Sequence, residues 1–132
     1  IDAGGYDSTG FRSSIAVADI IVSPIEASTF SSQTIPIINN IVHQARAFNR
    51  KLKAFLFINK APTNASLVAR EVIPTVESIK SLALIYQFCE TIIYDRVVYR
   101  DGITSGKGIL ELSSDDKASK ELKALYKEIF ND

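Results

Sequence analysis

The 132-residue chain has the length of one domain and is long enough to bury a real core. Hydrophobic residues make up 46% of it and charged residues 23%, a composition typical of a globular protein and not of a disordered one. Fifteen basic residues balance fifteen acidic ones, so any binding to nucleic acid or membrane must come from a local patch.

Cys89 is the only cysteine and His43 the only histidine. An intrachain disulfide and a zinc site of histidines and cysteines are therefore excluded, and a cytoplasmic protein is the simplest interpretation. No apolar run is long enough to span a bilayer, and the glycine-rich, acidic start is unlike a signal peptide. Because Ile1-Asp2 has the pattern of a strand end and methionine is missing throughout, we expect the chain to be part of a longer one.

Short apolar runs alternate with helix-length amphipathic stretches along the chain. Continuous apolar runs are typical of strands buried on both faces of a parallel sheet, and they cover residues 20–24, 54–58 and 88–93. The intervening stretches predict helices over residues 8–18, 33–48 and 67–79. This alternation predicts an α/β fold, with a mostly parallel sheet, flanking helices and right-handed crossovers.

Three residues are expected to shape the middle helices. Pro36 should lie in the first turn of its helix, where proline is tolerated. Either Asn64 or Ser66 should cap the following helix, and Pro74 should kink or split it.

The last predicted helix has the clearest pattern. Ser113 is its expected N-cap, with Asp116 three residues later as in a capping box. One face carries the apolar residues Ala118, Leu122, Leu125 and Ile129. The opposite face carries the basic residues Lys120, Lys123 and Lys127, with Lys117 near its edge.

Polar residues follow the strand-like segments where they end, which is where parallel sheets bind ligands. Asp2 can hold Mg²⁺ through water, while Gly4 and Gly5 let a main-chain amide approach a phosphate. Alternatively, Asp2 caps a turn that the two glycines make. The amide of Asn59 offers a donor and an acceptor to an adenine edge, and its alternative role is in a turn or a helix cap.

Asp95 and Arg96 follow the third run. Arg96 can pair with a phosphate or a carboxylate, and its alternative role is a surface ion pair. Because buried parallel strands bring their ends together, these groups are expected to converge at one edge of the sheet.

The order and spacing of these motifs resemble the ParA/MinD group of deviant P-loop ATPases over essentially the whole chain, and above all plasmid-partition proteins of the ParA/ParF type. Residues 1–5 look like the Walker B and switch II segment, and residues 18–25 like the strand after the switch helix. Residues 57–60 look like the base-contacting strand end, and residues 91–111 like the family's arginine, tyrosine, glycine and glutamate signature.

The resemblance implies a three-layer P-loop NTPase fold in which residues 1–132 are the C-terminal part of a single ATPase domain. It makes Asp2 the catalytic Walker B acid near Mg²⁺ and puts Gly4 and Gly5 beside the γ-phosphate. It also implies a base-binding role for four residues, with Tyr94 standing where many relatives have proline: Asn59, Ile93, Tyr94 and Asp95.

The family's phosphate-binding loop, K-G-G-x-G-K-[ST], has no counterpart in these residues, since Ser105-Gly106-Lys107-Gly108 lacks its spacing and is expected to be a turn. We expect the loop upstream of Ile1, and this chain alone neither to hydrolyse ATP nor to bind ATP and Mg²⁺ tightly. In the family, the loop's strand lies beside the equivalent of residues 20–24. Without it, those residues would form an apolar sheet edge that another chain should cover.

The resemblance also implies an ATP-dependent homodimer, non-specific DNA binding and a centromere-binding partner protein. DNA contact requires clustered basic residues. One candidate cluster is Arg46, Arg50, Lys51 and Lys53, and the other is Lys117, Lys120, Lys123 and Lys127. Either cluster can instead be a solvated surface. A membrane role is disfavoured because the last helix has no spare apolar face.

The predicted function is therefore ATP-dependent partition of plasmid or chromosomal DNA. Two alternatives stay open. One is a MinD-like ATPase that positions another cargo. The other is a non-catalytic α/β interaction module that kept the fold and lost the nucleotide site. The sequence upstream of Ile1 discriminates between an ATPase and such a module.

Overall fold

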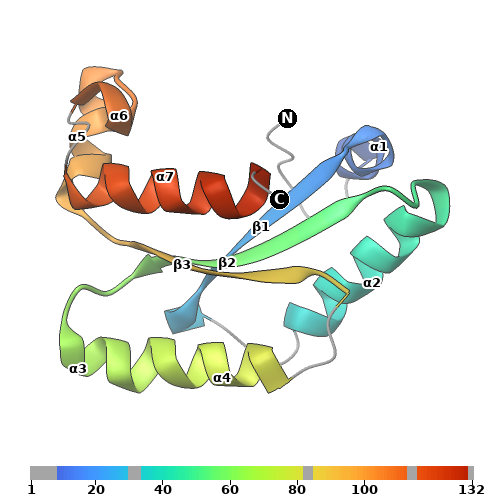
Figure 1. Ribbon diagram of the computed structural model, residues 1–132, viewed down its shortest axis with the longest axis horizontal. Coiled ribbons are helices and arrows are strands. Elements are labelled where there is room, and N and C mark those ends of the chain that lie inside the picture. The colour runs from blue at the N-terminus through green and yellow to red at the C-terminus, as the bar shows by residue number, and fades with distance from the viewer. Residues whose placement is uncertain (1–8, 30–33, 82–84, 113–115, 131–132) are drawn as a thin grey trace.

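The computed structural model describes residues 9–29, 34–81, 85–112 and 116–130. Its strands are β1 (Ile20–Glu26), β2 (Lys53–Ala61) and β3 (Gln87–Tyr94). They form a parallel sheet in the order β1-β2-β3 (Figure 1). The predicted α/β alternation and parallel sheet are confirmed, and each of the three apolar runs lies inside one strand.

Helices cover both faces of the sheet (Figure 1). On one face lies α7 (Lys117–Phe130), and on the other lie α2 (Thr34–Phe48) and α4 (Ile73–Ser81). The first helix, α1 (Thr9–Val17), packs against α2. The shorter elements are a 3₁₀ turn η1 (Ala27–Thr29), α3 (Ala65–Leu67), a π turn η2 (Val68–Val72), α5 (Val97–Ser105) and α6 (Ile109–Leu112).

The central strand β2 carries the core on both of its faces. Leu56 and Ile58 are fully buried in a cluster that includes residues of α2 and α4, whereas Phe55 packs into a second cluster with Leu125 and Ile129 of α7. Successive side chains of a strand alternate between faces, so a strand covered on both sides must be apolar throughout. Each such side chain stabilises the fold by roughly 2 kcal/mol on burial.

Two predicted irregularities between β2 and β3 are confirmed. The side chain of Asn64 caps α3, because its Oδ1 accepts hydrogen bonds from the amides of Ser66 (2.9 Å) and Leu67 (3.4 Å). Pro74 has no N–H for an α-helical bond, and the helix is split before it by the wider turn of η2, which precedes α4. The hydroxyl of Thr75 donates to the carbonyl of Glu71 at 2.7 Å.

Helices α5 and α6 form a hairpin that stands off the body of the molecule (Figure 1). Its turn is the predicted one at residues 105–108. Gly106 ends α5 in the left-handed conformation, at φ 64°, and its N–H reaches the carbonyls of Gly102 and Ile103. A side-chain carbon on Gly102 would lie 3.0 Å from the carbonyl oxygen of Lys107, so any larger residue would require the turn to shift slightly.

The last helix begins later than the sequence suggests. It starts at Lys117, and the carboxylate of Asp116 accepts a hydrogen bond from the amide of Ser119 at 2.7 Å. Asp116 therefore fills the capping role predicted for Ser113, which lies outside the described residues, and that prediction is wrong. The predicted apolar face is confirmed, with Ala118, Leu125 and Ile129 buried and Leu122 packed against the same cluster.

Two carboxylates of α7 bind the main chain of β3. The oxygens of Glu128 accept from the amides of Glu90 and Thr91, each at 2.8 Å, and from the Thr91 hydroxyl. About two helical turns earlier, an oxygen of Glu121 accepts from the amide of Tyr94 at 3.4 Å. The β2–β3 register shifts between Leu56 and Ile58, beside this part of β3. Thus α7 both covers one face of the sheet and satisfies donors of an outer strand.

Candidate nucleotide site at the strand ends

The carboxyl ends of the three strands meet at one edge of the sheet, as predicted. Glu26 of β1 is the register partner of Asn59 of β2, and the amide of Asp95, just after β3, donates to the carbonyl of Ala61 at 2.8 Å. Asn59 is half-buried, and no hydrogen bond to its side-chain amide is seen within the described ranges. Its donor and acceptor are therefore available to a ligand at this edge.

Lys60 is the residue at this edge that sequence reasoning passed over. Its φ of 51° lies in the left-handed region, which residues other than glycine seldom adopt. Its Nζ lies 2.8 Å from Oε1 of Glu26, and this hydrogen-bonded contact raises the pKa of the lysine. The register of β2 against β3 also shifts between Ile58 and Ala61. The only advance signal was the polar Asn-Lys pair that ends an apolar run.

A cavity of about 390 Å³ opens beyond the end of β3. Its lining combines apolar and charged side chains and includes Thr63, Asp95, Val97, Val98, Asp116 and Lys117. Of the residues predicted to line a base pocket, Asp95 alone lines this cavity. The contributions of Asp116 and Lys117 come from the start of α7, which the sequence does not place near β3.

Ile93 and Tyr94 do not come together at this cavity. Ile93 is buried against Leu125 and Ile129 under α7, whereas Tyr94 packs against the cluster on the opposite face of the sheet. Neighbouring residues of a strand must point to opposite faces, so a single pocket wall cannot use both side chains. Their predicted contacts with a base are therefore restricted to the main chain or to one of the two.

Arg96 is held by a carboxylate. Its Nε lies 3.1 Å and 3.2 Å from the two carboxylate oxygens of Glu121, and a terminal guanidinium nitrogen makes a further hydrogen bond to the same group. This hydrogen bonding raises the pKa of the arginine. The pair is largely buried, with side-chain exposures of 23% and 15%, unlike the surface ion pair considered as the alternative. Arg96 also lines the cavity beyond the end of β3.

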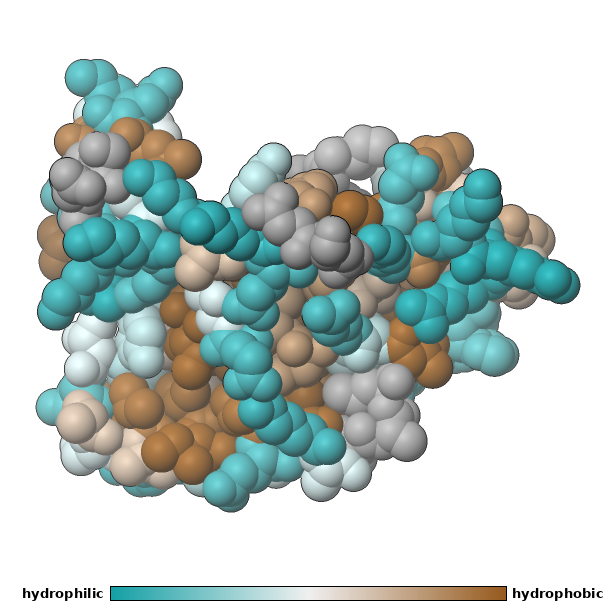
Figure 2. Space-filling model, viewed as in Figure 1, coloured by the Kyte–Doolittle hydropathy of each residue, from teal (hydrophilic) through white to brown (hydrophobic). Residues whose placement is uncertain are grey.

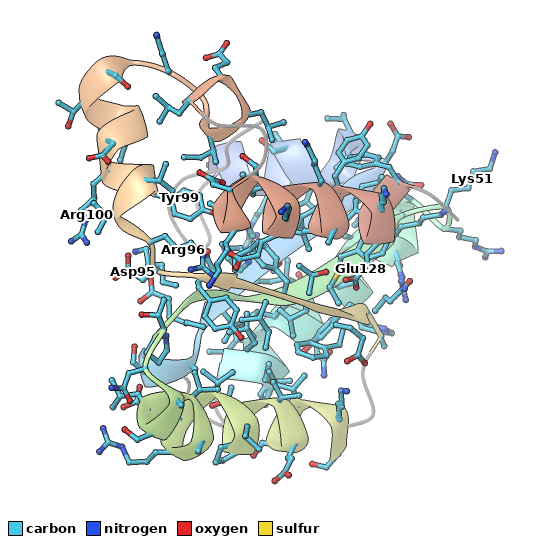
Figure 3. The ribbon with its side chains drawn as sticks, turned by 60° about the vertical axis from the view of Figure 1, so that its left-hand side comes forward. Lys51, Asp95, Arg96, Tyr99, Arg100 and Glu128 are labelled. Carbon is cyan, nitrogen blue, oxygen red and sulfur yellow. The ribbon has the colours of Figure 1, made fainter. Side chains whose placement is uncertain are left out.

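Figure 3 shows the surroundings of this pair. Asp95 and Arg96 lie at the end of β3, Tyr99 lies between α5 and α7, and Glu128 lies at the far end of α7. Burial raises the pKa of Tyr99, and the nearby Glu121 carboxylate acts in the same direction. The buried hydroxyl oxygen of Tyr99 has no hydrogen-bond partner in the described part of the chain.

The residues predicted to bind Mg²⁺ and the γ-phosphate, Asp2, Gly4 and Gly5, lie outside the described residues. Their roles stay predictions. Within the described ranges, no three His, Cys, Asp or Glu side chains are grouped as a metal site would require.

The two candidate DNA surfaces differ. In the first, Arg46 is half-buried and its Nε donates to the carbonyl of Leu52 at 3.3 Å, while Arg50 and Lys51 are exposed. In the second, all four lysines are exposed on α7: Lys117, Lys120, Lys123 and Lys127. Hydrophilic side chains gather over α7 in Figure 2. The neighbouring Glu121 and Glu128 bind Arg96 and β3, so their carboxylates are turned inward and away from this basic face.

The described helices include none that is both long and apolar enough to cross a bilayer. No protein-family model matches the chain, and no curated protein matches it in sequence. The likeness to ParA/MinD ATPases thus rests on the motifs, their order and their spacing.

Proposed function

We propose that this chain is the C-terminal part of a ParA-type ATPase that partitions plasmid or chromosomal DNA. The observation that carries the proposal is the convergence of Glu26, Asn59 and Asp95 at the ends of three parallel strands. Nucleotides bind at this edge in α/β sheets. The half-buried amide of Asn59 suits the hydrogen-bonding edge of adenine, and the cavity beside Asp95 has room for part of a nucleoside.

In this proposal the described residues supply the base-binding side of the site. The cation that follows β3, Arg96, is already paired with Glu121, so we expect most of the phosphate binding to come from groups elsewhere. An upstream K-G-G-x-G-K-[ST] loop would supply a cradle of main-chain amides, with Asp2 holding Mg²⁺ through water. Hydrolysis then requires a polypeptide that contains both parts, and an ATP-dependent homodimer is part of the same proposal.

The base-binding step is testable with this chain alone. We expect millimolar adenosine to shift the NMR signals of the Asn59 side-chain amide and of the Asp95 main-chain amide. The Asn59→Ala variant should lose these shifts, whereas Asn40→Ala, a change on the exposed surface of α2, should keep them. Shifts confined to other surfaces would count against a base site at the strand ends.

The catalytic step is testable by joining the upstream coding sequence to this chain. If the upstream segment carries the predicted loop, the joined polypeptide should hydrolyse ATP and the present chain should not. An upstream segment without such a loop, with no turnover by the joined protein, would favour the non-catalytic module. The engagement of Arg96 by Glu121 is the observation in favour of that alternative.

For the DNA surface we favour α7, because its lysines are exposed and its carboxylates face inward. The double variant Lys120→Glu with Lys123→Glu should weaken ATP-dependent DNA binding in the joined polypeptide. It should also reduce the magnitude of the slope of log K against log salt by about 2, because about one phosphate contact is lost per lysine. Arg50→Glu with Lys51→Glu is the matched control. The reverse pattern would assign DNA contact to the surface around α2.

A further inference from the structure

The turn between α2 and β2 carries the basic cluster that the proposed function leaves without a role. It lies at the amino ends of the strands, and Figure 3 shows Lys51 pointing away from the body of the molecule, far from Asp95 and Arg96. Between Glu26 and Glu71 the sequence contains no acidic residue, although the whole chain is balanced in charge. The turn is therefore a local cationic surface.

Hydrogen bonds hold the backbone of this turn in place. The side-chain amide of Asn49 donates to the carbonyl of Ala18, just after α1, at 2.9 Å, and its oxygen accepts from the amide of Lys51 at 3.2 Å. Leu52 is buried, and its carbonyl accepts from Nε of Arg46. Asn49, Leu52 and Arg46 thus build the turn, and the exposed side chains beside them are the ones that a partner would meet.

Apolar side chains are exposed beside the cations. Phe48 is 87% exposed and Val17 is 72% exposed. Each precedes one of the two residues joined by the Asn49 side-chain bond, so the ends of α1 and α2 bring them to the same part of the surface. Arg50 and Lys51 follow and are exposed as well. We call Val17, Phe48, Arg50 and Lys51 the α2 tip.

The combination of groups in the α2 tip indicates the partner. Cations alone would suit a nucleic acid, but contacts to its phosphates gain nothing from an exposed valine. A surface of anionic lipid accepts both kinds of group, because its headgroups attract cations and its acyl boundary takes up apolar side chains. The long stems of arginine and lysine also lie favourably along such a boundary.

We propose that the α2 tip docks on an anionic lipid surface. Phe48 and Val17 enter the headgroup region, and Arg50 and Lys51 contact lipid phosphates. This contact is peripheral and needs no spanning helix. The sequence disfavours a membrane role for α7, whose apolar face packs on the sheet, and the α2 tip is a different surface.

The inference does not depend on the proposed function, because the α2 tip and the candidate nucleotide site lie at opposite ends of the strands. Failure to bind adenosine would leave lipid binding unchanged. Failure to bind lipid would leave both the base site and the DNA surface on α7 as they stand.

The test is co-sedimentation of this chain with vesicles. One set is pure phosphatidylcholine, and the other is an equal mixture of phosphatidylcholine and phosphatidylglycerol. We expect binding to the anionic vesicles only, because the apolar part of the α2 tip is small. Binding should weaken as salt is raised, since salt screens the cations. Equal binding to neutral vesicles would contradict the role of Arg50 and Lys51.

Charge reversal tests the cations. Arg50→Glu with Lys51→Glu should weaken binding to the anionic vesicles about tenfold or more. Lys120→Glu with Lys123→Glu makes the same change in charge on the exposed face of α7 and should leave vesicle binding intact. Circular dichroism checks that both double variants keep the fold.

Two changes at Phe48 test the apolar part. Phe48→Ser should weaken vesicle binding about tenfold. The chain contains no tryptophan, so Phe48→Trp gives a single indole emission, which should shift to the blue when anionic vesicles are added. Ile103 on α5 is 84% exposed and provides the controls. Ile103→Ser should keep vesicle binding, and the emission of Ile103→Trp should not shift.

Several results would overturn the proposal. A chain that binds neither kind of vesicle does so, as does binding that is abolished by Lys120→Glu with Lys123→Glu. An unchanged emission from Phe48→Trp on bound vesicles places the contact elsewhere. A shift caused by duplex DNA and not by vesicles assigns the α2 tip to nucleic acid. The joined polypeptide should bind the same vesicles, and loss of binding there also counts against the α2 tip.

Discussion

The two outer strands of the sheet, β3 and β1, have different surroundings. Along β3, the carboxylate of Glu128 binds two consecutive main-chain amides, and Glu121 binds the amide of Tyr94 and the guanidinium of Arg96. Along β1, the side away from β2 borders a groove whose lining is apolar in its larger part. The comparison teaches that one outer strand has main-chain amides bound by a helix of the same chain, whereas the other borders a groove between helices.

The largest expected effect tests how firmly α7 closes its side. Leu125 is 7% exposed and packs with Phe55 and Ile129, so Leu125→Ala should lower the free energy of unfolding by about 3 kcal/mol. Urea unfolding measures it. Lys127→Ala, on the exposed face of the same helix, is the control and should change stability little. Equal losses from both variants would mean that helix propensity, and not packing on the sheet, holds α7.

Removal of the edge acceptor comes next. Glu128→Ala leaves the amides of Glu90 and Thr91 without a carboxylate, which should cost about 2 kcal/mol. Hydrogen exchange at these two amides should become faster, while exchange in β2 changes less. If the two amides keep their protection, the edge of β3 is not closed by this side chain.

A smaller effect is expected at the other end of α7. Arg96→Lys replaces a fork-shaped donor by a single ammonium and should destabilise the fold by about 1 kcal/mol. Arg100→Lys, on the exposed surface of α5, is its control. Comparable thermal melting points for the two variants would show that the pair with Glu121 contributes nothing specific.

The smallest effect near neutral pH concerns Cys89, which lies on β3 beneath α7. Burial raises the pKa of its thiol from an ordinary value of 9.0 to about 11, with Glu128 acting in the same direction. The unfolded thiol ionises first, so stability that is fully present below pH 9 is lost as the pH rises through 11. The difference between the chain and Cys89→Ala across this range isolates the contribution. A constant difference would mean that α7 lets water reach the thiol.

Patterns that depend on neighbours in sequence were predictable. Continuous apolar runs located the three strands, Asn64 was a plausible cap, and Pro74 had to interrupt its helix. The meeting of strand ends followed from parallel topology, without any long-range information. These features depend on the type of each residue and on its near neighbours in sequence.

Features that depend on distant partners were not predictable. Nothing local to Glu121 says that it will bind Arg96, which is 25 residues away in sequence. Its spacing of about two helical turns from Glu128, next to the apolar face, was the available signal. The left-handed backbone of Lys60 was also missed, because lysine is not a residue type that favours positive φ. Asp116 replaced Ser113 as a cap for a similar reason, since both are good capping residues.

The closely packed hairpin has a consequence for sequence variation. Gly102 sits against the carbonyl of Lys107, so even alanine there would require the turn to shift by a few tenths of an ångström. Gly106 has open space around it, and its left-handed backbone would also admit asparagine. Descendants of this chain should therefore keep glycine at position 102 and drift between glycine and asparagine at position 106. Four residues apart, these positions form a marker by which distant relatives of the hairpin can be recognised.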